Sequence, residues 1–153
     1  MAESFQTRLS RWGFNFFPAF RRTGGRLIYV AADWREVRVR LRFSRATRNY
    51  VGTMFGGSLY ASTDGVRAVM LMKLLGPGFI VWDKAATIRF WKPCRTAVHA
   101  TFAISEQETE TIRQRLAAEP KIDRQYQVDW VDESGTVYAT IDTTIHIRRK
   151  EPS

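Results

Sequence analysis

The sequence predicts an α+β fold in which an antiparallel sheet wraps around one long central helix, with a further helix at the N-terminus. Residues 59–75 are apolar on nearly every side, as in a helix that is buried all round. Most other patterned segments alternate apolar and polar residues with a period of two, which indicates strands that bury one face. One buried helix among several strands favours helices gathered on one side of an antiparallel sheet.

The length and charge of the chain limit its class. At 153 residues the chain fits one domain with its own core, and we expect residues 1–153 to form that single domain. It has 24 lysines and arginines against 15 aspartates and glutamates, a formal net charge of +9. This balance favours anionic partners such as phosphorylated ligands, nucleic acid or a membrane surface, without choosing among them.

Cysteine, histidine and hydropathy patterns argue against several classes of site. The one cysteine, Cys94, fits a reducing compartment, so we expect a cytoplasmic protein. His99 and His146 are in phase with polar residues of strand patterns, so we expect both to face solvent, and neither is spaced to a second metal ligand. We therefore expect no metal and no cofactor. The longest apolar stretch is interrupted by Arg67 and Lys73, and we expect no membrane span and no signal peptide.

Residues 1–25 form an N-terminal helical segment with two interpretations. Phe5, Leu9 and Trp12 fall at helical spacing beside two arginines, and Gly13 and Pro18 should then break or bend the helix. Such a basic, aromatic segment could lie on an anionic membrane surface. We favour a helix packed over the domain or at a dimer seam, because two turns offer little area for membrane burial.

The strands follow in order along the chain. In residues 37–43 three arginines alternate with apolar residues, and we expect a solvated sheet face there, and no nucleic-acid binding, because aromatic platforms are missing. A short polar helix over 106–119 is held by Ile112 and Leu116, and residues 132–135 indicate a hairpin. About five or six strands result, over residues 26–34, 36–43, 80–91, 96–105, 124–131 and 136–147.

The predicted central helix, residues 55–76, contains the best candidate site. Its start has a Gly-Gly pair, which allows a ligand or another chain to approach the backbone closely. Asp64 lies seven residues after Gly57, about two helical turns, so both should share a face. Burial in an apolar helix would raise the pKa of Asp64. The alternative is a structural role in which Asp64 pairs with Arg67 three residues on.

Several motifs carry a resemblance to a known superfamily. Phenylacetyl-CoA thioesterases have Asn, a short Gly-containing loop, His-Gly-Gly and a small apolar run ending in Ala-Asp. Here the corresponding residues are Asn49, Gly52, Phe55, Gly56, Gly57 and, over 58–64, SLYASTD. Phe55 stands where that pattern has His. The chain also resembles the domain of unknown function 4442 in NYVGTMFGG (49–57), VWDKAATIRFWKP (81–93) and DESGTVYAT (132–140).

The resemblance implies a hotdog fold, in which a sheet wraps a central helix, and an acyl-CoA thioesterase. It also implies a homodimer, or a dimer of dimers, with active sites at the seam. Gly57 N–H would then polarise the thioester carbonyl and Asp64 would act as base or nucleophile. The candidate substrate-binding residues are Asn49, Phe55, Gly56 and Ser58.

Other functions and roles stay open at this point. The main alternative is a non-catalytic module that binds acyl-CoA or another lipid-like ligand, with Phe55 closing the loop. A dehydratase would need a histidine near the Gly-Gly pair.

Asn49 could bind a ligand or only close its loop. Asp83 and Lys84 should form a local polar pair. We expect the tryptophans to lie in the core or at an interface, namely Trp82, Trp91 and Trp130. The arginines that could meet coenzyme A phosphates are Arg45, Arg48, Arg148 and Arg149.

Overall fold

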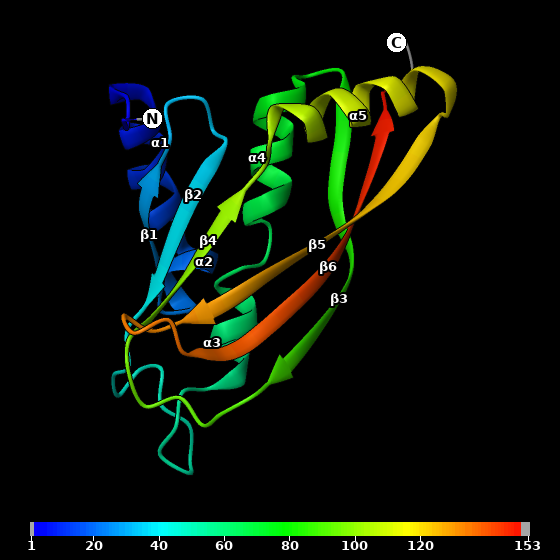
Figure 1. The fold of residues 1–153 in the computed structure, drawn as a ribbon. Helices are drawn as coiled ribbons and strands as arrows, with labels where there is room; N and C mark the ends of the chain where they lie inside the picture. The colour runs from blue at the N-terminus through cyan, green and yellow to red at the C-terminus, as the bar shows by residue number, and fades with distance from the viewer. Residues whose placement is uncertain (1, 151–153) are drawn as a thin grey trace.

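A computed structural model of the chain describes residues 2–150. The helices are α1 (Phe5–Phe16), α2 (Pro18–Arg22), α3 (Gly56–Ala61), α4 (Val66–Leu75) and α5 (Glu106–Ala118). The strands are β1 (Gly25–Val30), β2 (Glu36–Leu41), β3 (Phe79–Phe90), β4 (Val98–Ala103), β5 (Lys121–Val131) and β6 (Val137–Arg149). They form one six-stranded antiparallel sheet in the order β1-β2-β4-β5-β6-β3. Figure 1 shows the sheet curving around α3 and α4, with α1 beside β1.

The α+β architecture and the antiparallel sheet are confirmed, but the prediction of one continuous helix over 55–76 is wrong. The helix ends after Ala61 and begins again at Val66, so the sheet encloses two shorter helices. Gly65 adopts a left-handed conformation with φ 73°, which ends a helical path. The Thr63 hydroxyl donates to the Tyr60 carbonyl at 2.7 Å, and such bonds compete with helix formation.

The core lies between the sheet and α3 and α4. Trp130 is fully buried and its indole N–H donates to the Leu59 carbonyl at 2.8 Å, so its prediction as a core residue is confirmed. Trp82 and Trp91 are instead exposed and do not belong to the core. Because apolar burial dominates folding free energy, the contact of Trp130 with α3 is a main anchor of that helix on the sheet.

The prediction that His146 faces solvent is wrong. Only 8% of its surface is exposed. Its neighbours across the sheet are Asp123 on β5 and Trp82 on β3. The Asp123 carboxylate lies 2.6 Å from Nδ1, and the Trp82 ring lies 4.3 Å from the imidazole. Two long neighbours on one sheet face therefore cover a histidine that alternation alone would leave in water.

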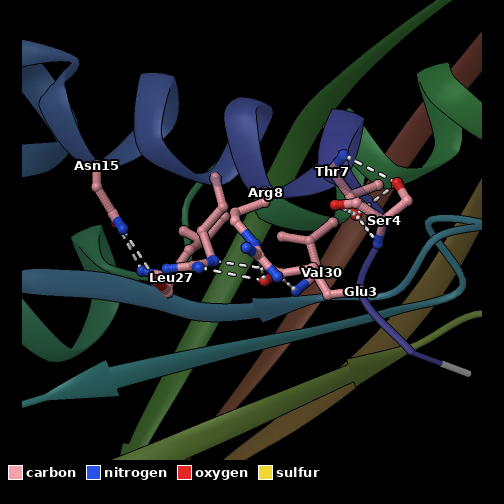
Figure 2. A network of polar contacts seen from close by, with 8 residues as sticks. Glu3, Ser4, Thr7, Arg8, Asn15, Leu27 and Val30 are labelled. Carbon is pink, nitrogen blue, oxygen red and sulfur yellow. Dashed lines mark hydrogen bonds and ion pairs between the residues drawn. The ribbon is translucent and has the colours of Figure 1, made fainter.

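Helix α1 runs along the free edge of β1, as Figure 2 shows. Asn15 makes two bonds to the backbone of Leu27: its Nδ2 donates to the carbonyl at 2.9 Å, and its Oδ1 accepts from the N–H at 2.8 Å. At the other end of the strand, Glu3 accepts from the Val30 N–H at 3.2 Å. Polar side chains of α1 and of the residues just before it thus satisfy edge groups of β1, which protects the edge from pairing with another chain.

The packing of α1 on the domain matches the favoured interpretation, and the predicted break at Pro18 is confirmed, but the one at Gly13 is wrong. The helix does not break at Gly13; it continues to Phe16, and Pro18 begins α2. A capping box between Ser4 and Thr7 stabilises its start, and one internal glycine costs only about 1 kcal/mol. The face of α1 that packs on β1 is mostly polar, because the strand edge offers hydrogen-bonding groups, and Phe14 next to Asn15 packs against the core.

Replacing Asn15 with Leu should destabilise the fold. Both Leu27 backbone groups would lose their partner, and two unsatisfied groups near a buried residue cost about 1–3 kcal/mol in the free energy of unfolding. Urea denaturation measures this difference. Gln6→Leu, at an exposed position of the same helix, is the matched control and should change the free energy by less than about 0.5 kcal/mol. Equal effects of both substitutions would contradict the edge-protecting role of Asn15.

Candidate active site

The loop before α3 is closed by Asn49. Its side-chain Oδ1 accepts from the backbone N–H groups of Val51 at 3.1 Å and Thr53 at 3.0 Å, and its Nδ2 donates to the Thr53 hydroxyl at 2.9 Å. Both ends of the amide are therefore used within the loop, as in an Asx turn. The loop-closing interpretation of Asn49 accounts for all of these contacts, and a direct role toward a ligand stays a prediction.

The loop delivers two unpaired donors at the start of α3. Among residues 2–150, neither the Gly56 N–H nor the Gly57 N–H donates a hydrogen bond, because the first helix-start bonds begin at Ser58. An aromatic ring lies over each glycine. A methyl group on Gly56 would lie 2.7 Å from Cζ of Phe90, and one on Gly57 would meet the ring of Phe55. If a ring turns aside, the two free N–H groups can donate hydrogen bonds to a carbonyl oxygen.

A hollow of about 560 Å³ opens beside these donors. Its floor includes Leu59 and Met54, both buried, and its rim has the exposed cations Lys92 and Arg95. The full lining is Asn49, Val51, Thr53, Met54, Gly56, Leu59, Phe90, Trp91, Lys92, Pro93, Cys94 and Arg95. An apolar hollow with a few polar groups and a basic rim has the size and chemistry of a site for an anionic small molecule.

Asp64 lies in the break between α3 and α4, and it is exposed rather than buried as predicted. The break between α3 and α4 causes this exposure, because it directs residue 64 away from the apolar surface of the two helices. The next residue, Gly65, donates its backbone N–H to Oδ2 of Asp83 at 2.9 Å. Asp83 on β3 thus holds the break in place and brings a second carboxylate close to Asp64.

The electrostatics at the break are those of two neighbouring carboxylates. Burial raises the pKa of Asp83 and the charge of Asp64 raises it further, against the lowering effect of the Gly65 N–H. The pKa of the Tyr60 phenol is also raised, first by burial and then by the charges of Asp64 and Asp83. Since both acids act on the same phenol and Asp64 also acts on Asp83, the three groups form one cluster.

The alternative role for Asp64, a pair with Arg67, is not what the structure has. The Arg67 guanidinium is buried and donates to the carbonyls of Ala103 at 3.0 Å and Gln127 at 3.1 Å. It also lies over the rings of Phe102 and Tyr126. Arg67 therefore ties α4 to β4 and β5, and Asp64 is left available at the surface.

The predicted site residues fall into two groups within one chain. Asn49 and Gly56 line the hollow, and Gly57 and Phe55 are their chain neighbours at the start of α3, whereas Asp64 does not line it. Ser58, predicted to contact substrate, is buried below the first turn of α3, and its role stays a prediction.

Sequence reasoning missed two residues of β3. Phe90 covers Gly56. Asp83 does not pair with Lys84, which bonds to Asp123 at 2.6 Å instead, because successive strand residues point to opposite faces. An acid within an otherwise apolar strand start was the one signal that could have identified Asp83.

The Asp83→Asn substitution should stabilise the fold in a pH-dependent way. The folded-state pKa is raised, so wild-type stability is greatest below the ordinary Asp pKa and falls as pH rises through the folded pKa. Asn keeps an acceptor for the Gly65 N–H and carries no charge. We expect the variant and wild type to unfold alike near pH 3 and the variant to be the more stable near pH 7, as urea denaturation at each pH measures. A gain of the same size at both pH values would contradict the raised pKa.

The first comparison with known proteins gives a family match. A family model described as a domain of unknown function, DUF4442, matches residues 6–147. No curated protein matches the chain.

Solved structures share the fold at low sequence identity. A Pseudomonas aeruginosa protein of unknown function, described as a probable thioesterase, is 20% identical with a TM-score of 0.83, over 98% of this chain and 100% of that one. A thioesterase from Haemophilus influenzae is 13% identical with a TM-score of 0.69, over 96% and 93%. Mouse thioesterase superfamily member 2 is 19% identical with a TM-score of 0.66, over 94% and 98%. At these identities the similarity shows the fold alone.

Proposed function

Because this chain belongs to the DUF4442 family and shares the fold of the hotdog thioesterases, we propose that it hydrolyses an acyl-coenzyme A thioester to a free acid and coenzyme A. The observation that carries the proposal is the pair of unpaired N–H groups at Gly56 and Gly57, beside an apolar hollow with a basic rim that Gly56 lines. Such donors suit the oxygen of a carbonyl that becomes negative during acyl transfer.

The proposed reaction is a hydrolysis in two steps. Asp64 takes a proton from water, whose oxygen attacks the thioester carbonyl carbon, while the carbonyl oxygen gains negative charge and is held by the Gly57 N–H. The carbon–sulfur bond then breaks, the acid is released, and the coenzyme A thiolate takes up the proton. Asp83 does not contact substrate in this scheme; it positions Asp64 through the Gly65 N–H.

The two groups of site residues would meet in a homodimer. Strand β3 is a sheet edge, and its residues 84–87 are exposed in succession, although alternate residues of a covered strand are buried. Antiparallel pairing of two β3 strands, centred between Ala86 and Thr87, would place residue 85 of one chain opposite residue 88 of the other, with Asp83, just beyond the bulge before Ala85, toward residue 90. The acids of one subunit would then lie near the glycines of its partner.

The rim of the hollow suits the nucleotide end of coenzyme A. Lys92 and Arg95 are exposed there, and cations of this kind bind phosphate groups. Arg48 precedes Asn49 and lies near the same loop, where its backbone forms an antiparallel β-bridge with that of Met54. Arg148 and Arg149 line a different hollow at the end of β6. We therefore assign the phosphate-binding role to Arg48, Lys92 and Arg95.

The second candidate function is binding of acyl-CoA without turnover. It is favoured by Phe55, whose ring lies over Gly57, the proposed donor. If that ring keeps its place when ligand is bound, the carbonyl cannot reach the donor, and the hollow would hold the thioester intact.

Incubation with a panel of acyl-CoA esters, from short to long and aromatic acyl groups, separates the two functions. Free thiol is measured for turnover and calorimetric titration for binding. Thioester hydrolysis supports the enzyme, and saturable binding of an ester with no thiol release supports the binding module. The Phe55→Ala variant, which uncovers Gly57, should release thiol faster than wild type, and a slower release would contradict the covering role of this ring.

A further inference from the structure

The outward face of α1 carries large apolar side chains that are more than half exposed. Phe5, Leu9, Trp12 and Phe16 recur every three or four residues and so share one helix face, and Phe17 follows them. We call these five residues the α1 stripe. Each has between 57% and 79% of its surface exposed. A contiguous apolar patch of this kind on a folded domain marks a surface that meets a partner or a membrane.

The exposure of the stripe is a consequence of how α1 is attached. Asn15 on the polar face of the helix and Glu3, just before the helix, bond to the edge of β1, as Figure 2 shows. An amphipathic helix normally buries its apolar face against its own core. Here the opposite face packs, and twelve residues of helix present their apolar side to the surroundings.

Arginines gather where the stripe ends. Helix α2 continues from Phe17, and its Arg21 and Arg22 line a hollow of about 560 Å³ on β1 and β2. Five arginines line this hollow, which we call the arginine hollow: Arg21, Arg22, Arg26, Arg40 and Arg42. Its lining contains no carboxylate, and none of the five makes an ion pair with any residue in 2–150. Arg26 donates to the backbone carbonyls of Arg21 and Gly25. Guanidinium groups without a carboxylate partner around one hollow suit phosphate groups.

The charge of this region selects the kind of partner. Residues 2–26 hold five arginines and one acid, Glu3, which is already bonded to Arg11 at 2.8 Å. A symmetric contact between two copies of the stripe would bring these like charges together, which is unfavourable. An anionic phospholipid bilayer offers both an apolar layer for aromatic and aliphatic side chains and phosphates for the arginines.

We propose that the protein binds the surface of anionic phospholipid membranes, with the α1 stripe lying in the interface and the arginine hollow taking lipid phosphates. The helix would lie in the membrane plane, and no segment would cross the bilayer. No helix among residues 2–150 is both long and apolar enough to span one. This inference does not depend on the proposed hydrolysis, because the stripe and the hollow lie outside the glycine loop and the Asp64 break.

Co-sedimentation with vesicles tests the proposal. The full chain is mixed with vesicles of phosphatidylcholine alone or of phosphatidylcholine with phosphatidylserine. We expect binding to the mixed vesicles that weakens as salt rises. The double variant Leu9→Gln and Trp12→Gln should bind at least about tenfold more weakly, because two large apolar side chains lose their burial. Both positions are exposed, so thermal unfolding should be unchanged.

A charge-matched pair of variants tests the arginine hollow. Arg21→Gln with Arg22→Gln should weaken binding to mixed vesicles by about fivefold for each arginine. The control, Arg113→Gln with Arg115→Gln on α5, removes the same charge from another helix and should bind nearly as wild type does. Equal loss in both pairs would show that only net charge matters and would overturn the assignment of the hollow.

Two other outcomes would overturn the proposal as a whole. One is that wild-type protein binds neither kind of vesicle. The other is that light scattering without vesicles shows the Leu9→Gln and Trp12→Gln variant to have a smaller oligomeric mass than wild type. A second copy of the chain would then be what covers the stripe.

Discussion

Asp64→Asn should lower thioester turnover by about two to four orders of magnitude, because amide nitrogen and oxygen cannot take the proton of the attacking water. Binding of the acyl-CoA ester should change little, since Asp64 is exposed and lies outside the hollow that would hold the ligand. The measurement is thiol release under saturating ester, with calorimetric titration of the same variant. Loss of turnover with retained binding separates a chemical role from a structural one.

The matched control for this variant is Glu133→Gln, which neutralises an exposed carboxylate in the hairpin before β6. It should hydrolyse the ester as fast as wild type. If Asp64→Asn also turns over normally, the assignment of the base is wrong, and the Asp83 carboxylate would be the group to test next.

Mixing two inactive variants should restore activity. If Gly57 of one subunit acts with Asp64 of the other, a mixed dimer of Gly57→Val and Asp64→Asn chains contains one site with both groups intact. After random re-pairing of equal amounts, about a quarter of wild-type turnover should return, since half of the dimers are mixed and each has one working site. Thiol release before and after mixing measures the recovery.

The same experiment decides against the shared site if nothing returns. In that result, the mixture of the two variants stays as inactive as each variant alone, although size-exclusion chromatography shows that the subunits have exchanged. Gly57 is exposed and its backbone has no strained φ. A side chain there would meet the ring of Phe55, which is itself exposed and can move aside, so it should block the donor without unfolding α3. Dimers that fail to form at all would instead contradict the pairing of β3 edges.

The sequence was sufficient for the architecture, because hydrophobic periodicity reports which face of an element is buried. The strand patterns and the buried character of α4 are examples, and Trp130 in the core follows from the same signal. Periodicity could not report the break at Ser62 to Gly65. There the left-handed conformation of Gly65 and its bond to Asp83 act against the helix, and Asp83 lies 18 residues further along the chain.

The candidate site was predicted in parts. The Gly-Gly pair has unpaired donors, as its place before a helix suggested, but the rings of Phe55 and Phe90 over the two glycines depend on tertiary contacts. The exposure of Asp64 depends on the same break in the helix. For α1 the periodicity identified the apolar stripe, while its outward direction is set by the hydrogen-bonding needs of the β1 edge, which only the sheet order reveals.

The most direct test of the account is a single-turnover measurement with wild-type protein in excess over the acyl-CoA ester that binds best in the panel. Under these conditions even slow chemistry converts the bound ligand. The account predicts that the thioester is recovered as free acid and coenzyme A, at a rate that falls by about two to four orders of magnitude in Asp64→Asn. Recovery of the intact thioester from its complex with the wild-type protein would contradict it.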